Sequence, residues 1–431
     1  MRKRSALTGL WLPLLLSLLL SSCGIVPERS APVFQWEGSV PSESDSPSLD
    51  SVKAMWLSQF DLYPICVQNG EQRPVTDFIR LVRQMTDRLT DLGINTLFVQ
   101  VRPNGDSFYP SELFPMSRYA VGAIGKAARY DPFGLLLELA HDANLSVHAW
   151  INPLRCFTEA DRAALPKDHA LLALCDGERM TEVGGVWYLN PAYEENLTLI
   201  AQGAEEILRL YDVEGIHIDD YFYPTSEESF DRAAYTAYLN DGGTRSLADF
   251  RRERTHRLVQ RLYETVHAAA GDRLFGVSPG GNTRRNYEEL YADTAAWCAS
   301  GIVDYLCPQV YFGLEHETLP FDRVCREFAQ MTAPNGVALL IGMTLEKAHK
   351  GFYGESDPYA GSGAREWIEH RDVLVRCLSY TADLPTCAGV SFFSYRLFFS
   401  PEDGTSVKAT EEARSLLLPL LLQTEFQAAF P

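Results

Sequence analysis

The sequence predicts an α/β protein built as a single closed barrel of eight parallel strands, a (β/α)8 TIM barrel, and three observations predict it. Eight short apolar runs recur from Val52 onward, and amphipathic stretches at helical spacing separate them. No Gly-rich phosphate-binding turn follows any run, although an open doubly wound sheet usually has one. Polar and aromatic residues gather directly after the runs, which is where barrel enzymes place their sites.

The predicted strands are short apolar runs, and helical patterns separate them. The eight strands are expected at residues 54–60, 96–101, 146–151, 215–218, 275–278, 305–310, 338–343 and 390–395. The clearest helical face between them comprises Phe78, Leu81, Val82, Met85, Leu89 and Leu92. A second such face comprises Leu258, Val259, Leu262 and Val266. Alternation of strand and helix implies parallel pairing with right-handed crossovers.

The N-terminal residues indicate export and lipid attachment. Arg2, Lys3 and Arg4 precede an apolar core, and small residues then lead to Cys23. This order resembles a bacterial lipobox, so we expect a lipoprotein signal peptide at residues 1–22 and lipidation of Cys23. An ordinary cleaved signal is the alternative. The mature protein is therefore expected to be an extracytoplasmic, membrane-anchored lipoprotein.

The rest of the chain divides into a linker and one domain. Residues 23–50 are rich in Ser, Pro and Glu and poor in aliphatic residues, which predicts a flexible tether. Residues 51–431 then form the barrel domain, because α/β barrels reach this length through loop insertions. The sequence leaves the oligomeric state open.

Charge and motif content exclude several classes of function. The formal net charge is -19, and no basic stripe appears, so a nucleic-acid partner is not expected. There is no His-Glu-x-x-His motif and no Gly-x-Ser-x-Gly motif. We therefore expect neither a metal, nor another cofactor, nor a serine nucleophile.

Candidate site residues follow the predicted strands at the carboxyl ends. They are Asp61 after the first strand; Arg102, Asn104 and Asp106 at the second; Asn152 and Arg155 after the third; Asp219, Asp220, Tyr221 and Tyr223 after the fourth; Gln309 and Tyr311 at the sixth; and Tyr395 at the eighth. In a parallel barrel these ends meet at one mouth, so the sequence predicts a single site there.

Several of these segments carry a family resemblance. The matching pieces occur in order at residues 100–106 (QVRPNGD), 109–111 (YPS), 130–132 (YDP), 148–153 (HAWINP), 189–191 (LNP), 215–224 (GIHIDDYFYP), 278–279 (SP) and 308–311 (PQVY). With them the chain resembles the family called glycosyl hydrolase-like 10, whose barrels sit in bacterial lipoproteins and cell-envelope proteins. The resemblance implies hydrolysis of glycosidic bonds, and members include enzymes that cut peptidoglycan strands stripped of their stem peptides.

Glycosidic hydrolysis normally requires two carboxyl groups, one as acid and one as nucleophile or base. Strand alternation projects His217 and Asp219 to the same side, and Asp220 follows where the strand becomes loop. We therefore expect at least one of Asp219 and Asp220 to be catalytic. Asp106 and Asp61 are the alternatives for a second carboxyl, although a structural role in a turn competes for Asp106.

The remaining candidates are expected to bind sugar hydroxyls or stack on sugar rings. They are Asp61, Arg102, Asn104, Asn152, Arg155, Tyr221, Tyr223, Gln309, Tyr311 and Tyr395. For Trp150, and for His148 and His217, packing inside the barrel is the favoured interpretation.

Three other functions compete with hydrolysis of a cell-envelope glycan. The first is a glycosidase of dietary or exopolysaccharide chains. The second is a sugar-binding surface lipoprotein without catalysis, which would have no need of adjacent acids such as Asp219 and Asp220. The third is a metal-dependent deacetylase or amidase, which the missing metal motif disfavours.

Overall fold

The computed structural model describes residues 49, 51–175, 177–269 and 272–426. The predicted signal peptide, Cys23 and nearly all of the predicted tether lie outside the described residues.

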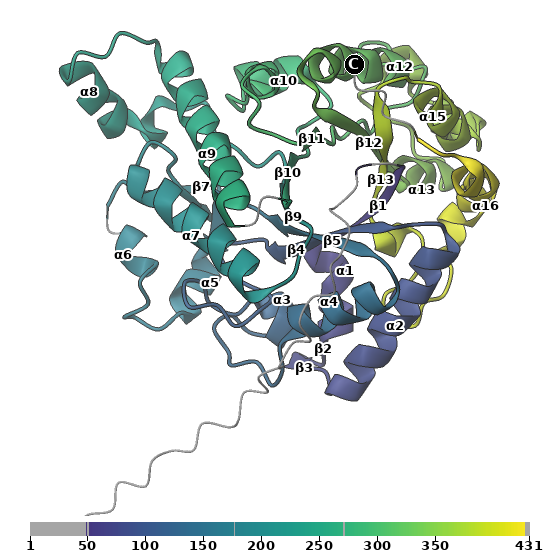
Figure 1. Cartoon of the computed structure of the whole chain (residues 1–431), viewed down its shortest axis with the longest axis horizontal. Coiled ribbons are helices and arrows are strands. Elements are labelled where there is room, and N and C mark those ends of the chain that lie inside the picture. The colour runs from purple at the N-terminus through teal and green to yellow at the C-terminus, as the bar shows by residue number, and fades with distance from the viewer. Residues whose placement is uncertain (1–48, 50, 176, 270–271, 427–431) are drawn as a thin grey trace, which may run out of the picture. The chain divides into compact units, whose positions relative to one another are not determined.

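Eight parallel strands close into a barrel, as the sequence predicts (Figure 1). They are β1 (Val52–Leu57), β4 (Thr96–Arg102), β5 (Ser146–Ile151), β9 (Gly215–Ile218), β10 (Leu274–Val277), β11 (Tyr305–Leu306), β12 (Ala338–Thr344) and β13 (Cys387–Phe393). Neighbours in the chain are neighbours in the barrel, and β1 closes it by pairing with β13. Each predicted strand overlaps an observed one; the first ends earlier, because Ser58 and Asp61 form a capping box that starts a helix.

A helix follows each strand on the outside of the barrel (Figure 1). The outer helices are α2 (Val75–Asp91), α4 (Pro132–Asp142), α7 (Glu194–Leu210), α9 (Leu247–Ala269), α11 (Thr294–Ala299), α12 (Phe321–Thr332), α15 (Val373–Ala382) and α16 (Lys408–Gln423). The predicted apolar face of the first helix is confirmed, since Phe78, Leu81, Val82, Met85 and Leu89 of α2 are all buried.

Shorter elements lie in the loops between strands and outer helices. The helices are α1 (Gln59–Cys66), α3 (Arg118–Val121), α5 (Glu159–Ala164), α6 (Leu172–Cys175), α8 (Arg232–Asn240), α10 (Thr283–Glu288), α13 (Glu346–Phe352) and α14 (Glu366–Glu369). The 3-10 turns are Glu228–Phe230, Ala333–Asn335, Gly361–Gly363 and Tyr395–Leu397. Two small antiparallel sheets also lie in these loops. One pairs β2 (Val67–Gln68) with β3 (Glu71–Gln72). The other has β8 (Val186–Leu189) between β6 (Arg155–Thr158) and β7 (Met180–Val183).

The core has two layers, because successive strand residues point to opposite faces. One layer fills the space between strands and helices. The other fills the barrel interior and includes Trp56, Phe98, Trp150 and Tyr305. Gly276 makes room there, since a Cβ at this position would lie 1.9 Å from Cζ of the Tyr305 ring.

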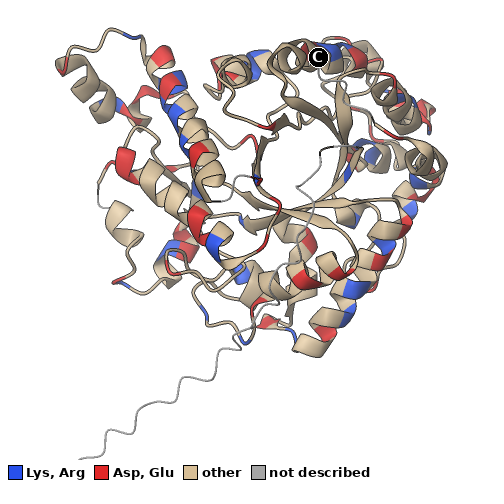
Figure 2. Ribbon diagram, in the orientation of Figure 1, with Lys and Arg blue, Asp and Glu red and all other residues tan. Residues whose placement is uncertain are grey.

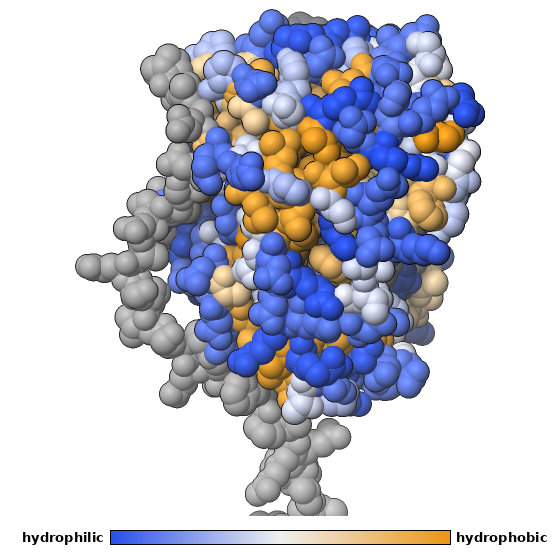
Figure 3. All heavy atoms as spheres, turned by 90° about the vertical axis from the view of Figure 1, so that its right-hand side faces the viewer, coloured by the Kyte–Doolittle hydropathy of each residue, from blue (hydrophilic) through white to orange (hydrophobic). Residues whose placement is uncertain are grey.

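Charged residues lie mainly on the outer helices and loops (Figure 2). Figure 3 views the side on which α16 lies, where apolar side chains gather within a largely hydrophilic surface. On α16, Leu416 and Leu422 are 45% and 49% exposed. Among the described residues, no helix has the length and apolar content required to cross a membrane.

Candidate active site

A cavity of about 500 Å³ opens at the carboxyl ends of the barrel strands. Its walls come from several strand ends and the loops after them, which is the position that barrel enzymes use. The lining residues are Trp56, Ser58, Gln59, Phe60, Gln100, Trp150, Arg155, Tyr188, Asp219, Asp220, Tyr221, Phe222, Tyr223, Pro224, Ser278, Arg285, Leu290, Gln309, Tyr311 and Phe393.

Asp219 lies at the floor of the cavity, directly after β9. It is 3% exposed, as strand alternation predicts for a side chain that points into the barrel. Trp150 Nε1 donates a hydrogen bond to its Oδ2 (3.1 Å), and Asn152 Nδ2 donates to the same oxygen (3.0 Å). The backbone N–H of Tyr221 donates to Oδ1 (3.3 Å). Trp150 therefore does more than pack the barrel: it holds the Asp219 carboxyl.

Asp220 is the second carboxyl of the cavity. Gln309 Nε2 donates to its Oδ1 (3.0 Å) and also to the carbonyl oxygen of Ser278 (3.0 Å), which fixes the amide between the two. This contact joins the loop after β9 to the segment after β11. The predicted site residues Asp219, Asp220 and Gln309 are thus brought together.

Burial changes the acidity of this pair. It raises the pKa of Asp219 to about 8, and repulsion from Asp220 acts in the same direction. Burial also raises the pKa of Asp220, while the hydrogen bond from Gln309 opposes that rise. Because two neighbouring buried carboxyls resist carrying two negative charges, the pair retains a proton near neutral pH. One proton donor and one carboxylate are the chemical requirements of glycosidic hydrolysis.

A chain of buried polar groups lies beneath the pair, inside the barrel. Trp56 Nε1 donates to His217 Nε2 (3.2 Å), so the other ring nitrogen, Nδ1, carries the proton and donates to the Tyr305 hydroxyl (2.9 Å). That hydroxyl in turn donates to His148 Nδ1 (2.9 Å). Burial lowers the pKa of His148 to about 4 and lowers that of His217 well below its ordinary value. Both histidines are therefore neutral supports of the floor.

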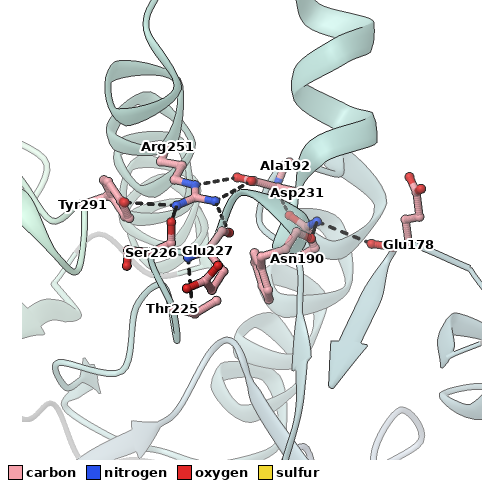
Figure 4. A network of polar contacts seen from close by, with 10 residues as sticks. Glu178, Asn190, Ala192, Thr225, Ser226, Glu227, Asp231, Arg251 and Tyr291 are labelled. Atoms are coloured by element: carbon pink, nitrogen blue, oxygen red, sulfur yellow. Dashed lines mark hydrogen bonds and ion pairs between the residues drawn. The ribbon is translucent and has the colours of Figure 1, made fainter. Parts of the chain in front are cut away.

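The loop after β9, which carries the acidic pair, is anchored by a buried ion pair (Figure 4). Arg251 of α9 donates to both carboxylate oxygens of Asp231, at 2.7 and 3.0 Å, and both side chains are fully buried. Arg251 also donates to the backbone carbonyls of Ser226 (3.1 Å) and Glu227 (2.7 Å). These contacts fix the far end of the loop on α9.

The same arginine supports an aromatic wall of the cavity. Its guanidinium lies 5.3 Å from the centre of the Tyr223 ring and 5.0 Å from that of Tyr291, and it donates to the Tyr291 hydroxyl (3.0 Å). Tyr223 lines the cavity and also packs edge-on against Phe230. The ion pair with Arg251 and the packing of Tyr223 against Phe230 and Tyr291 thus hold the loop in place.

Of the predicted binding residues, five line the cavity: Arg155, Tyr221, Tyr223, Gln309 and Tyr311. Two more, Asn152 and Asn104, do not line the cavity but contact residues that do. Asn152 accepts a hydrogen bond from Gln100 Nε2 (2.8 Å) while donating to Asp219, and Asn104 Nδ2 donates to Gln59 Oε1 (2.9 Å). Both therefore orient residues that line the wall.

Arg102 lies outside the cavity, contrary to the sequence prediction. The pairing register with β5 shifts between Gln100 and Arg102, so Gln100 pairs with Trp150 while Arg102 pairs with Ile151. The skipped residue reverses the alternation and turns Arg102 outward with Ile151. Its guanidinium there lies 4.5 Å from the centre of the Phe114 ring, and the side chain is 1% exposed.

Three other predicted residues do not line the cavity. Asp61 is fully buried and accepts hydrogen bonds from the Ser58 N–H (2.8 Å), the Ser394 hydroxyl (3.0 Å) and the Arg396 N–H (2.7 Å), which ties the loop after β1 to that after β13. Tyr395 is packed in the outer core. Asp106 accepts from the Asn104 N–H (2.8 Å), the contact of a turn, and burial raises its pKa to about 6.

Several lining residues are not among those predicted from the sequence: Trp56, Gln59, Phe60, Gln100, Tyr188, Arg285 and Phe393. Trp56 and Gln100 are strand positions that alternation could have placed inside the barrel, whereas Tyr188 and Arg285 come from insertions. No cluster of three or more His, Cys, Asp or Glu side chains suited to a metal occurs in the described part of the chain.

Comparison with known proteins identifies relatives along most of the chain. The family model described as glycosyl hydrolase-like 10 matches residues 52–358. The glycosyl hydrolase YngK of Bacillus subtilis (strain 168) is 32% identical over 337 residues, which are 73% of this chain and 64% of YngK. The chain thus spans just under two thirds of that relative. The glycosyl hydrolase DigH of Escherichia coli (strain K12) is 30% identical over 387 residues, which are 83% of this chain and 87% of DigH.

Solved structures share the fold at low sequence identity. An α-L-fucosidase from Paenibacillus thiaminolyticus superposes with a TM-score of 0.54 at 14% identity. The match covers 86% of this chain and 49% of the fucosidase chain. The PgaB (BpsB) glycoside hydrolase domain from Bordetella bronchiseptica matches 87% of this chain with 99% of its own, at a TM-score of 0.52 and 12% identity. The family match and the curated relatives show that the chain belongs to the glycosyl hydrolase-like 10 family, and the solved structures show that it shares their barrel fold.

Proposed function

We propose that this enzyme hydrolyses glycan strands of the cell envelope, with peptidoglycan as the substrate, and that Asp219 and Asp220 supply its acid and its nucleophile or base. The observation that carries the proposal is the pair itself: two buried carboxyls with raised pKa values on the floor of the cavity. Tyr221 and Tyr311 offer ring faces for sugars beside them. The family resemblance described above supports the choice of substrate.

The pair would divide the chemistry between its members. One carboxyl protonates the oxygen of the leaving sugar, and the other, as carboxylate, attacks or activates water at the anomeric carbon. The N–H donors around Asp219 and the Gln309 amide beside Asp220 hold both groups in place. No reorganisation of these groups is needed at the moment of reaction, which favours the transition state.

The substrate is tested by incubating the purified domain with three polymers: intact peptidoglycan, peptide-stripped peptidoglycan and a neutral exopolysaccharide. We expect new reducing ends from the stripped strands, identified by mass spectrometry. Release from the exopolysaccharide alone would instead support the competing glycosidase function. A protein that binds strands without cutting any of them would support the non-catalytic alternative.

The pH dependence of the rate follows from the acidic pair. Because the pKa of Asp219 is raised to about 8, the proton needed by the leaving oxygen is retained below that pH and lost above it. We therefore expect kcat/KM to fall as pH rises through about 8. A profile that already falls near pH 4, the ordinary range of an exposed aspartate, would show that the pair does not supply the acid.

We also propose that the enzyme is held at a membrane by lipid on Cys23. The support is the order of charge, apolar core and small residues before Cys23. Replacing Cys23 with Ser should release the protein from the membrane fraction in cell fractionation, with activity of the purified domain unchanged. Retention of the Cys23→Ser variant in that fraction would mean that another element anchors it.

A further inference from the structure

Two cationic side chains line the cavity, Arg155 and Arg285. Arg285 pairs with Glu289, with its Nε 3.3 Å from Oε2 of the carboxylate. No acidic side chain of the described residues lies within ion-pair distance of Arg155. In a chain whose net charge is -19, the cavity thus holds a cation that the described acids do not neutralise.

The position of Arg155 is fixed by its surroundings. It is the first residue of β6 and pairs with Tyr188 of β8, so its backbone is part of the small sheet beside the cavity. Its guanidinium lies 5.1 Å from the centre of the Tyr221 ring. Nε of Arg155 is buried and has no hydrogen-bond partner among the described residues. A buried donor without a partner is costly unless a ligand supplies the acceptor.

The chemistry of the missing acceptor follows from the neighbouring groups. The guanidinium that lies over the Tyr221 ring presents a planar fork of donors, and such a fork matches a carboxylate through two parallel hydrogen bonds. An anion would be repelled from the floor of the cavity by Asp219 and Asp220. Tyr221 donates its backbone N–H to Asp219 Oδ1 (3.3 Å), and its ring lies against the Arg155 guanidinium, so Arg155 lies beside a residue that contacts the reacting centre. A carboxylate at Arg155 therefore belongs to a sugar next to the one that is cleaved.

We infer that Arg155 is a specificity-determining residue that binds a carboxylate on a sugar adjacent to the scissile bond, so that the enzyme selects acidic glycans. The inference rests on the proposed function, in which Asp219 and Asp220 cut a glycan in this cavity. Two sources share this chemistry: an ether-linked acid, such as the free lactyl group of a peptide-stripped peptidoglycan sugar, and a uronic acid. When a stem peptide is attached, the lactyl carboxylate is converted to an amide and loses its negative charge.

The inference is tested with two matched substrate pairs. One pair is peptide-stripped peptidoglycan strands and the same strands with their carboxyls converted to methylamides; the other is a uronic-acid oligosaccharide and its methyl ester. For the source that the enzyme uses, we expect the wild type to prefer the free acid by about tenfold or more in kcat/KM. Arg155→Gln should remove the preference by raising KM for the acid alone, and Arg155→Lys should retain part of it.

Arg285→Gln is the matched control, because it removes the other cavity cation and should preserve the preference. Equal hydrolysis of acid and amide by the wild type would overturn the inference. So would an Arg155→Gln variant that loses the same factor on both members of a pair, since that result indicates a purely structural role.

A binding measurement separates this inference from the proposed function. Saturation-transfer NMR compares N-acetylmuramic acid with N-acetylglucosamine, and galacturonic acid with galactose, on the wild type and Arg155→Gln. If no strand is cut but an acid-selective signal disappears in Arg155→Gln, the proposed function fails, while the assignment of Arg155 as a carboxylate-binding residue stands. If strands are cut without any acid selectivity in rate or binding, the inference fails and the proposed function stands.

Discussion

Asp219→Asn or Asp220→Asn should lower kcat by about a hundredfold or more in at least one case, because positioned proton transfer alone contributes about 10²–10⁴-fold. The substitution keeps the size of the side chain and removes its ability to carry a proton or a charge. Asp219 is held by Trp150 and Asn152, and Asp220 by Gln309, so the fold should survive in both variants. Substrate binding should be largely retained, and steady-state kinetics with a binding assay measures the two quantities separately.

Asp106→Asn is the matched control. Asp106 is also a buried carboxyl with a raised pKa after a barrel strand, but it does not line the cavity. Its replacement should leave kcat within a fewfold of the wild type. If Asp219→Asn and Asp220→Asn both remain within a fewfold of the wild type, the assignment of the acidic pair is wrong, and Asp106 and Asp61 become the carboxyls to test.

Arg251→Met should lower the free energy of unfolding by about 3–5 kcal/mol, because it leaves the buried Asp231 carboxylate without its partner. Both side chains of this ion pair are 0% exposed, and the guanidinium also satisfies the Ser226 and Glu227 carbonyls. Since the loop that carries Asp219 and Asp220 ends at this anchor, activity should fall even at temperatures where the variant stays folded. Urea denaturation and kinetics on the same preparation measure both effects.

The neighbouring Arg252 offers the control for this experiment. It pairs with Asp249, whose side chain is 53% exposed, and exposed ion pairs contribute about 0–1 kcal/mol. Arg252→Met should therefore cost little in the same denaturation. Equal losses in Arg251→Met and Arg252→Met would show that the buried pair does not anchor the loop.

The fold was predictable because the strand and helix signals are periodic. Apolar runs at the barrel strands and the face of Phe78, Leu81 and Val82 on α2 follow from spacing alone. Asp219 was predictable in the same way, since alternation places it beside His217 on the inner face. Those inferences need only the spacing of residues along the chain, which can be read directly from the sequence.

Arg102 and Asp61 were placed wrongly for physical reasons that the spacing of residues does not reveal. Arg102 follows the same alternation as Gln100 in the sequence, but a register shift against β5 turns it outward. Asp61 follows a strand as Asp219 does, yet its carboxylate is taken up by Ser394 and Arg396, more than 300 residues away in the chain. Such outcomes depend on pairing and long-range contacts, so residue type after a strand does not settle them.

We propose that Asp219 and Asp220 at the end of β9 cut a glycan strand. The most direct measurement compares the wild type with the Asp219→Asn/Asp220→Asn double variant on peptide-stripped peptidoglycan, with new reducing ends counted by mass spectrometry and folding checked by circular dichroism. We expect the wild type to release reducing ends over time and the folded double variant to release none above background. Release at the same rate by the folded double variant would show that Asp219 and Asp220 do not catalyse the cleavage.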